Sequence, residues 1–444
     1  MENTNVRDQL RRVLAEWHDF ALPALVHRDA DDRILDKHQL VTVVGPRRAG
    51  KTWFCYQMMQ RLLAQGVPRA NVLYVNLEDE RLYPLTGEVL TALLDVQEEL
   101  YAEWHTGPRY CIVDEVQNAP QWSVWARRVV EQQPELHLAL TGSSSKLLST
   151  EIATELRGRA RTVVVAPYSF AEFARAAGAD SAYTASLVHG TQRNTYQRLF
   201  AQYMASGGFP AVQRRTDSRE MLQEYYRAMF TRDMIERFRV QSVRLFEDYL
   251  TLQISRFAAL SSLSGLQKEL AELGHVLSRS TLSQYLSHAQ EAFLLFSVPL
   301  YSPRVRQQMR APRKVYAVDH GLLNAIRFSA TEDRGRLLEN MVFMELWRRH
   351  GQGIYYHAGE HECDFLVRDG TTVVGALQAC WSLADGRTRE REVAGMLEAL
   401  QAHHLDSGTI VTEADEARLQ AGGKTVHVRP YWHWALELAA DRRK

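Results

Sequence analysis

The sequence has few cysteines and no long apolar run. Its four cysteines, Cys55, Cys111, Cys363 and Cys380, are scattered over 444 residues without a paired metal-ligand spacing, so we expect reduced packing residues. No apolar run approaches the roughly 18 residues that span a bilayer, and the stretch MENTNVRDQLRRVLAEW is charged from its first turns, unlike a signal peptide. These absences predict a cytoplasmic protein without a membrane partner.

An excess of charge of one sign is also lacking. Lys plus Arg and Asp plus Glu both total 53, so no global field draws the chain towards nucleic acid or an anionic membrane. Any such attraction must come from a local patch. The 45% hydrophobic and 24% charged residues are typical of a soluble globular protein, and 444 residues exceed what one core holds, which predicts two to four domains.

Changes in hydrophobic period give the domain boundaries, because the sequence contains no repeat and no low-complexity tract. An amphipathic helical pattern and the charged connector HRDADDR come first, and helical patterns follow the first α/β stretch. A later order of helices and then a hairpin is typical of a winged helix. The predicted segments are 1–36 (N-terminal helix and connector), 37–170 (first α/β domain), 171–256 (helical lid or connector), 257–328 (winged helix) and 329–444 (smaller α/β domain).

Short apolar runs alternate with helical stretches in the first α/β segment. The runs are LVTVVG, VLYVNL, YCIVDE, LHLALTG and TVVVAP. Runs that are apolar on both faces and separated by helices are typical of a parallel sheet covered on both sides. The predicted fold class is therefore α/β with a five-stranded parallel core sheet.

The segment VTVVGPRRAGKTW carries the phosphate-binding pattern G-x-x-x-x-G-K-[ST] directly after an apolar strand and before a helix. In this pattern the backbone N–H groups wrap the phosphates, Lys51 reaches the β and γ oxygens, and Thr52 offers a hydroxyl to Mg²⁺. The flanking strand and helix disfavour a chance match in a structural loop. The pattern predicts ATP and Mg²⁺ as ligands, bound by Gly45, Pro46, Arg47, Arg48, Ala49, Gly50, Lys51 and Thr52.

A second acidic element ends the buried run YCIVDE. Asp114 is predicted to hold the metal together with Thr52, and Glu115 to act on the attacking water. Adjacent carboxylates at a strand end often form only a solvated turn, but the phosphate-binding segment upstream favours catalysis. The strand VLYVNL between the two motifs and LHLALTG after them are typical of AAA-type P-loop ATPases, which insert a strand between the two motif-bearing strands.

Two further catalytic elements are expected downstream. Ser143 or Ser144 would touch the γ-phosphate or the water as a polar sensor, although a helix N-cap for SKLLST explains these serines equally well. Among Arg157, Arg159 and Arg161, we favour Arg157 or Arg159 as an arginine that reaches the γ-phosphate of a neighbouring subunit. That role predicts a homo-oligomer, and a solvated basic turn is the alternative.

Together these motifs resemble those of bacterial and archaeal AAA-type ATPases that carry a C-terminal DUF4143 domain. The resemblance covers nearly the whole chain and rests on GPRRAGKT, IVDEVQNAP, LRGRARTVVVAPYSFAEF, GGFPAV, KVYAVDHGLL and GRLLENMVFMEL. It implies an ATPase core, a winged helix and a terminal domain similar to the PD-(D/E)xK nuclease fold. Only the first two motifs explain their own chemistry.

The resemblance also implies where nuclease residues would lie. That fold needs an acidic residue on its first helix, an Asp that opens a strand and an (E/Q)-x-K on the next strand. Glu339 and Asp364 supply the first two, whereas the third reads Gln378, Ala379, Cys380. Gln378 replaces a charged ligand with a neutral one, and Cys380 stands where the lysine would be. A hard Mg²⁺ ion gains little from a thiol, so we expect a degenerate nuclease fold with a structural or recognition role. An active nuclease is the alternative.

Basic residues gather near the expected winged helix. They are Arg304, Arg306, Arg310, Arg313 and Lys314 between the two expected wing strands, with Arg279, Ser280, Thr281 and Gln284 near the start of a recognition-type helix. Contact with duplex DNA is one interpretation. The other is an interdomain lid with a solvated basic loop.

The leading hypothesis is an ATP-hydrolysing AAA-type ATPase that acts as a nucleotide-driven switch or remodeller, with its helical and winged-helix segments moving as the γ-phosphate comes and goes. One alternative is an ATP-regulated DNA-binding sensor with slow hydrolysis. Another, less favoured because the nuclease motif is incomplete, is an ATP-dependent nuclease effector.

Overall fold

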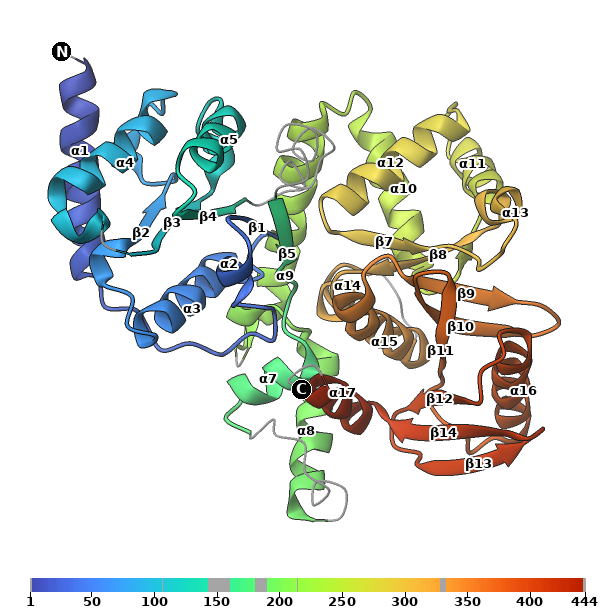
Figure 1. Ribbon diagram of the computed structural model, residues 1–444. Helices are drawn as coiled ribbons and strands as arrows, with labels where there is room; N and C mark the ends of the chain where they lie inside the picture. The colour runs from blue at the N-terminus through green and yellow to red at the C-terminus, as the bar shows by residue number, and fades with distance from the viewer. Residues whose placement is uncertain are drawn as a thin grey trace. The chain divides into compact units, whose positions relative to one another are not determined.

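The computed structural model describes residues 2–105, 107–142, 160–179, 190–213, 215–327 and 333–441. The chain divides into two compact units, Met1–Ala166 (unit 1) and Pro167–Lys444 (unit 2) (Figure 1). Among the described residues, no helix combines the length and the apolar character that crossing a membrane requires.

Unit 1 alternates strands and helices, as the apolar runs predict. Its helices and strands are α1 (Glu2–Asp19), α2 (Ile34–Lys37), β1 (Leu40–Val44), α3 (Lys51–Ala64), η1 (Arg69–Asn71), β2 (Val72–Asn76), η2 (Glu80–Leu82), α4 (Glu88–Leu100), η3 (Ala102–His105), β3 (Arg109–Asp114), η4 (Val116–Asn118), α5 (Trp122–Gln132), β4 (Leu136–Thr141) and β5 (Ala160–Val164).

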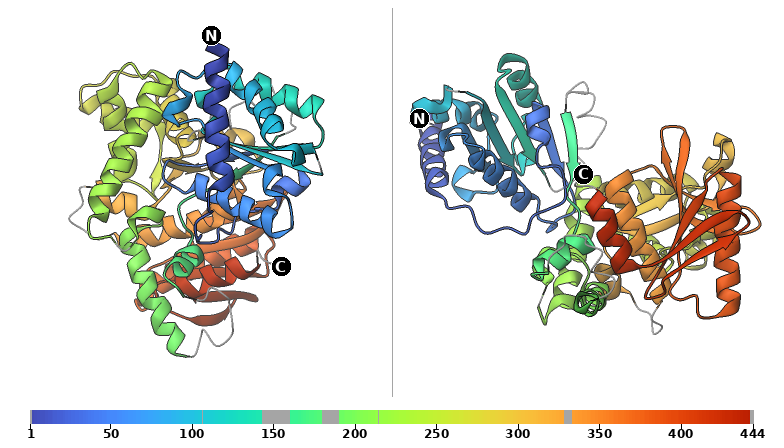
Figure 2. Two further views of the ribbon diagram at one scale, coloured as in Figure 1. Left: turned by 90° about the vertical axis from the view of Figure 1, so that its left-hand side faces the viewer. Right: turned by 60° about the horizontal axis from the view of Figure 1, so that its bottom comes forward.

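The five strands of unit 1 form one parallel sheet in the order β2-β3-β4-β1-β5. Helices α2 and α3 cover one face and α4 and α5 the other, while α1 runs beside β2 and α4 (Figures 1 and 2). All five residues of β1 are buried, because helices cover the sheet on both sides. Strand β4 lies between β1 and β3, so the predicted inserted strand and the AAA-type α/β fold class are confirmed.

Unit 2 begins with helices and ends with a mixed sheet. Its elements are α7 (Phe170–Ala176), α8 (Thr191–Ser206), η7 (Pro210–Val212), α9 (Ser218–Ala228), the π-helix η8 (Met229–Glu236), α10 (Val243–Ser255), β6 (Leu260–Ser261), α11 (Leu263–Glu272), α12 (Arg279–Glu291), β7 (Leu295–Val298), α13 (Val305–Arg310), β8 (Arg313–Ala317), α14 (His320–Ile326), α15 (Arg334–His350), β9 (Ile354–Ala358), β10 (Glu362–Asp369), β11 (Thr372–Ala379), α16 (Gly386–Ala402), β12 (Ser407–Thr412), β13 (Ala417–Ala421), β14 (Lys424–Pro430) and α17 (Tyr431–Asp441).

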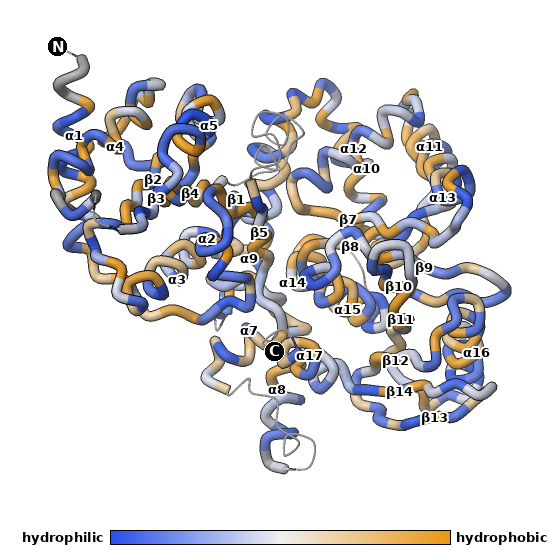
Figure 3. Tube along the Cα trace, viewed as in Figure 1, coloured by the Kyte–Doolittle hydropathy of each residue, from blue (hydrophilic) through white to orange (hydrophobic). Residues whose placement is uncertain are grey.

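Unit 2 contains a three-stranded antiparallel sheet, β6-β8-β7, and a six-stranded mixed sheet, β13-β14-β12-β11-β10-β9. Strands β11, β12 and β14 are parallel neighbours, and the outer strands pair antiparallel. Helix α16 packs on β10, β11, β12 and β14, and α17 lies beside α7 and α8 (Figure 2). Hydrophobic residues follow the sheets and α15, whereas α13 is mostly hydrophilic and has no buried residue (Figure 3).

Two details of unit 2 differ from the sequence predictions. The expected wing loop between β7 and β8 contains the short helix α13. Lys314 lies within β8 and is buried, so its assignment to an exposed basic loop is wrong. Strand β8 is buried on both faces from Lys314 to Ala317, and of its residues only Arg313, at its start, is exposed.

Candidate functional site

The phosphate-binding segment lies between the end of β1 and the start of α3. Gly45 has φ +148°, and a Cβ there would lie 2.1 Å from the Val165 carbonyl oxygen, so only glycine fits. Gly50, with φ +97°, turns the chain into α3. The buried Lys51 opens this helix, and its Nζ donates to the carbonyls of Gly45 and Pro46 at 3.2 Å each. Ala49 is also buried, Arg47 is half-buried and Arg48 is exposed.

Asp114, at the end of β3, joins this segment to the two strands on either side, β2 and β4. Thr52 donates its hydroxyl to Asp114 Oδ2 at 2.7 Å, and Tyr74, from β2, donates its own to the same oxygen at 3.0 Å. Thr141, at the end of β4, donates to Oδ1. Burial and then the charge of Asp114 raise the pKa of Tyr74, which keeps this hydroxyl a donor. The structure therefore brings together Thr52 and Asp114, the two residues that the sequence assigns to the metal.

Glu115 follows Asp114 in a left-handed conformation with φ 54°, which is uncommon for a residue other than glycine. Its backbone N–H donates to the Thr141 hydroxyl at 3.1 Å, and the Gln117 side chain donates to its carboxylate. The carboxylate is thus restrained by hydrogen bonding beside Asp114.

The buried Arg28, which no motif indicates, contacts the same segment. Its Nη1 donates to the Ala49 carbonyl at 2.8 Å, its Nη2 donates to the Ala166 carbonyl after β5, and its backbone N–H donates to Gln57 Oε1 at 2.7 Å. The predicted N-terminal connector therefore braces the phosphate-binding segment. Sequence periodicity gives no signal for this role, because the contacts depend on tertiary packing.

The other predicted catalytic residues cannot be placed in the same way. Ser143, Ser144, Arg157 and Arg159 lie outside the described residues. Arg161 lies in β5 and is exposed. The sensor and arginine-finger roles stay predictions.

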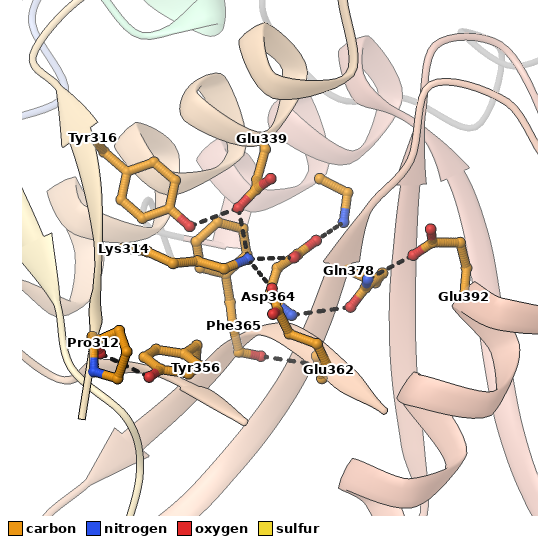
Figure 4. Close-up of polar contacts among 12 residues, drawn as sticks. Pro312, Lys314, Tyr316, Glu339, Tyr356, Glu362, Asp364, Phe365, Gln378 and Glu392 are labelled. Carbon is orange, nitrogen blue, oxygen red and sulfur yellow. Dashed lines mark hydrogen bonds and ion pairs between the residues drawn. The ribbon is translucent and has the colours of Figure 1, made fainter. Parts of the chain in front are cut away.

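Unit 2 contains a cluster of charged side chains around Lys314 (Figure 4). The Lys314 Nζ lies 3.0 Å from Glu339 Oε1, 2.6 Å from Glu362 Oε1 and 2.7 Å from Asp364 Oδ1. Tyr316 donates its hydroxyl to Glu339 Oε1 at 2.7 Å. Strand β8, helix α15 and strand β10 thus meet in what we call the carboxylate cluster, which consists of Lys314, Glu339, Glu362 and Asp364.

The carboxylate cluster opens on a cavity of about 680 Å³ that Arg336, His361 and Arg391 also line. Burial by itself lowers the pKa of Lys314, but Asp364 and then Tyr316, Glu339 and Glu362 outweigh it and raise that pKa well above its usual value. Burial and then Asp364 raise the pKa of Glu339 to about 8. The ammonium therefore stays charged in the cluster.

Two protein families and several known proteins are similar to this chain. The AAA domain family matches residues 37–174, and a domain of unknown function, DUF8612, matches residues 197–333. An uncharacterized protein of Methanocaldococcus jannaschii is 28% identical over 425 residues, which cover 93% of this chain and 91% of that protein. An uncharacterized protein of Haemophilus influenzae is 26% identical over 343 residues, 76% of this chain and 82% of that one.

Among solved structures, a Walker-type ATPase of Pyrococcus abyssi is similar at a TM-score of 0.43 and 16% identity, over 66% of this chain and 92% of that one. The second matched domain is DUF8612, and the resemblance to DUF4143 drawn from the motifs stays a prediction. The chain thus contains an AAA domain of the P-loop class in residues 37–174 and a DUF8612 domain in residues 197–333.

Proposed function

We propose that the chain binds and hydrolyses ATP in unit 1 and works as a nucleotide-driven switch or remodeller. The observation that carries this proposal is the 2.7 Å hydrogen bond between Thr52 and Asp114, beside Lys51 and the glycine-bounded segment. A hydroxyl and a carboxylate are hard oxygen donors of the kind that Mg²⁺ prefers, so the residues present fit Mg²⁺ and a triphosphate. The AAA domain match supports the same assignment.

Each residue then has a chemical role. The backbone of Gly45, Pro46, Arg47, Arg48, Ala49 and Gly50 would cradle the phosphates, with Lys51 on the β and γ oxygens. Thr52 and Asp114 would hold Mg²⁺, which when bound neutralises phosphate charge. The Glu115 carboxylate would accept the proton of the attacking water. Its hydrogen bond from Gln117 would break first. The proposal also includes Ser143 as the polar sensor of the γ-phosphate. In a homo-oligomer, Arg157 or Arg159 would reach the γ-phosphate of the neighbouring subunit.

Steady-state ATP turnover tests the assignment of Glu115. Glu115→Gln should keep nucleotide binding and lower turnover by about 10² to 10⁴-fold, because a general base contributes that much. Glu135→Gln, an exposed residue of the same unit, is the matched control and should turn over ATP like the wild type. Equal turnover in the wild type and Glu115→Gln would reject the role of Glu115.

A DNA-binding sensor is the second candidate function. Arg279, Arg304, Arg306 and Arg310 are exposed, and among the residues that the structure describes none of them forms an ion pair with an acidic side chain. Exposed arginines without acidic partners suit contact with phosphates. In this proposal residues 257–328 act as a winged helix, and residues 171–256 as the lid that links them to the ATPase core.

A further inference from the structure

The metal ion that a PD-(D/E)xK-like domain would use does not fit the carboxylate cluster. Both oxygens of Asp364 have partners, because Oδ1 accepts from Lys314 at 2.7 Å and Oδ2 from the Ala379 backbone N–H at 2.9 Å. Glu339 Oε1 accepts from Lys314 at 3.0 Å and from Tyr316 at 2.7 Å. The Lys314 ammonium fills the space between these carboxylates, where a divalent ion would bind (Figure 4).

The third element of the nuclease motif, Gln378 to Cys380, forms hydrogen bonds within the protein. Gln378 Oε1 accepts from the Asp364 backbone N–H at 2.9 Å, and its amide donates to Glu392. Cys380 donates its thiol to the Ser382 carbonyl at 3.3 Å. Burial and then Glu392 raise the pKa of this thiol to about 11, so it is protonated at neutral pH and a poor ligand. Within the described ranges, no group of three or more His, Cys, Asp or Glu residues is arranged to hold a metal.

The Lys314 ammonium is surrounded by carboxyl groups of the same chain. The Lys314 side chain is 3% exposed, and a buried ammonium is stable only when carboxylates surround it closely. Burial and then the charge of Asp364 raise the pKa of Glu339 above its usual value. Glu339, Glu362 and Asp364 all lie within 3.0 Å of the ammonium.

We propose that Lys314 is a built-in cation that takes the position of a divalent metal ion and closes the carboxylate cluster to metal. The ammonium joins β8 of the three-stranded sheet to β10 of the six-stranded sheet and to α15. The carboxylate cluster is thereby an internal ion cluster without metal that connects the two sheets of unit 2. This inference is independent of ATP binding, because every residue of the cluster lies in unit 2.

Binding of Mn²⁺ to the full-length chain without nucleotide tests the proposal, because carboxylate oxygens suit this ion. Electron paramagnetic resonance counts free Mn²⁺ in titrations of the wild type, Lys314→Met and the matched exposed-lysine variant Lys268→Met, each with and without Asp364→Asn. Asp364→Asn should leave Mn²⁺ binding by the wild type and by Lys268→Met unchanged. Lys314→Met should gain a stoichiometric Mn²⁺ site, and Asp364→Asn should abolish that gain.

Two results would overturn the proposal. The first is Mn²⁺ binding by the wild type that Asp364→Asn removes, because metal would then displace the ammonium. The second is a folded Lys314→Met protein, checked by circular dichroism, that gains no Mn²⁺, because the ammonium would then not stand in a cation position. If Lys314→Met does not fold, the comparison of the wild type with Asp364→Asn decides alone, with unchanged binding in support and lost binding against.

Discussion

Tyr74 belongs to no sequence motif, yet its hydroxyl contacts Asp114 at 3.0 Å. A hydrogen-bond partner of a metal-holding carboxylate fixes the orientation of that carboxylate, and its loss typically costs about 10 to 100-fold in metal affinity. We therefore expect Tyr74→Phe to raise the Mg²⁺ concentration for half-maximal ATP turnover by about 10-fold. Turnover at saturating Mg²⁺ should change little.

Tyr110→Phe is the control for this prediction. Tyr110 is a buried tyrosine of the adjacent strand β3, and its ring stacks on His137 at a centroid distance of 5.2 Å. Its removal should leave the Mg²⁺ dependence unchanged. If Tyr74→Phe and the wild type share one Mg²⁺ dependence, Tyr74 does not position Asp114 for metal binding.

For single residues, the sequence pattern indicated the phosphate-binding segment more clearly than the carboxylate cluster. Gly45, Lys51, Thr52 and Asp114 follow a local pattern whose chemistry is visible in the sequence, and Thr52 and Asp114 do meet. Lys314 was misassigned because its acidic partners Glu339 and Asp364 lie 25 and 50 residues further along the chain. A run of basic residues does not show which of them turns inward.

Elements of unit 2 explain two motifs whose chemistry the sequence left open. In GGFPAV, Gly208 donates its backbone N–H to Asp319 of KVYAVDHGLL at 2.7 Å, and Asp319 also caps α14 through Leu322 N–H at 2.9 Å. A Cβ on Gly321 would lie 2.3 Å from the Ser206 carbonyl oxygen. The motifs therefore fix the end of α8 against the start of α14.

Gly321→Ala should destabilise the protein by about 1 to 3 kcal/mol, the usual cost of forcing a methyl group into a packed contact. Gly335→Ala is the matched control, because a Cβ at Gly335, in the first turn of α15, meets nothing within 4 Å. That variant should be neutral or slightly stabilising. Urea midpoints of the three proteins check the prediction, and equal midpoints for the two variants would contradict it.

Periodicity also predicted the elements unevenly. Strands β1 to β4 of unit 1 were predicted because both of their faces are buried, which produces continuous apolar runs such as LVTVV in β1. In unit 2, the edge strand β13 has no buried residue and reads ARLQA, and in β14, which reads KTVHVRP, buried residues alternate with partly exposed ones. Neither strand therefore gave a continuous apolar run. Edge strands that face solvent leave a weak pattern in the sequence.

For the whole molecule, equal numbers of acidic and basic residues mean that DNA binding must depend on the local arginines. If DNA binds there, log affinity should fall with log salt by about 0.9 per phosphate contacted. The double variant Arg304→Ala/Arg306→Ala should then flatten that slope by about 1.8. Arg215→Ala removes an exposed arginine that pairs with Asp217 at 2.8 Å and should keep the slope. A salt-independent signal would remove the DNA-binding candidate.

Nucleotide binding by the whole chain tests the central claim most directly. Isothermal titration calorimetry with ATP and Mg²⁺ compares the wild type with Lys51→Ala, whose lost ammonium would contact the β and γ oxygens. We predict saturable binding to the wild type and none to a folded Lys51→Ala protein. Equal binding by both proteins, or no binding by the wild type, would contradict the account.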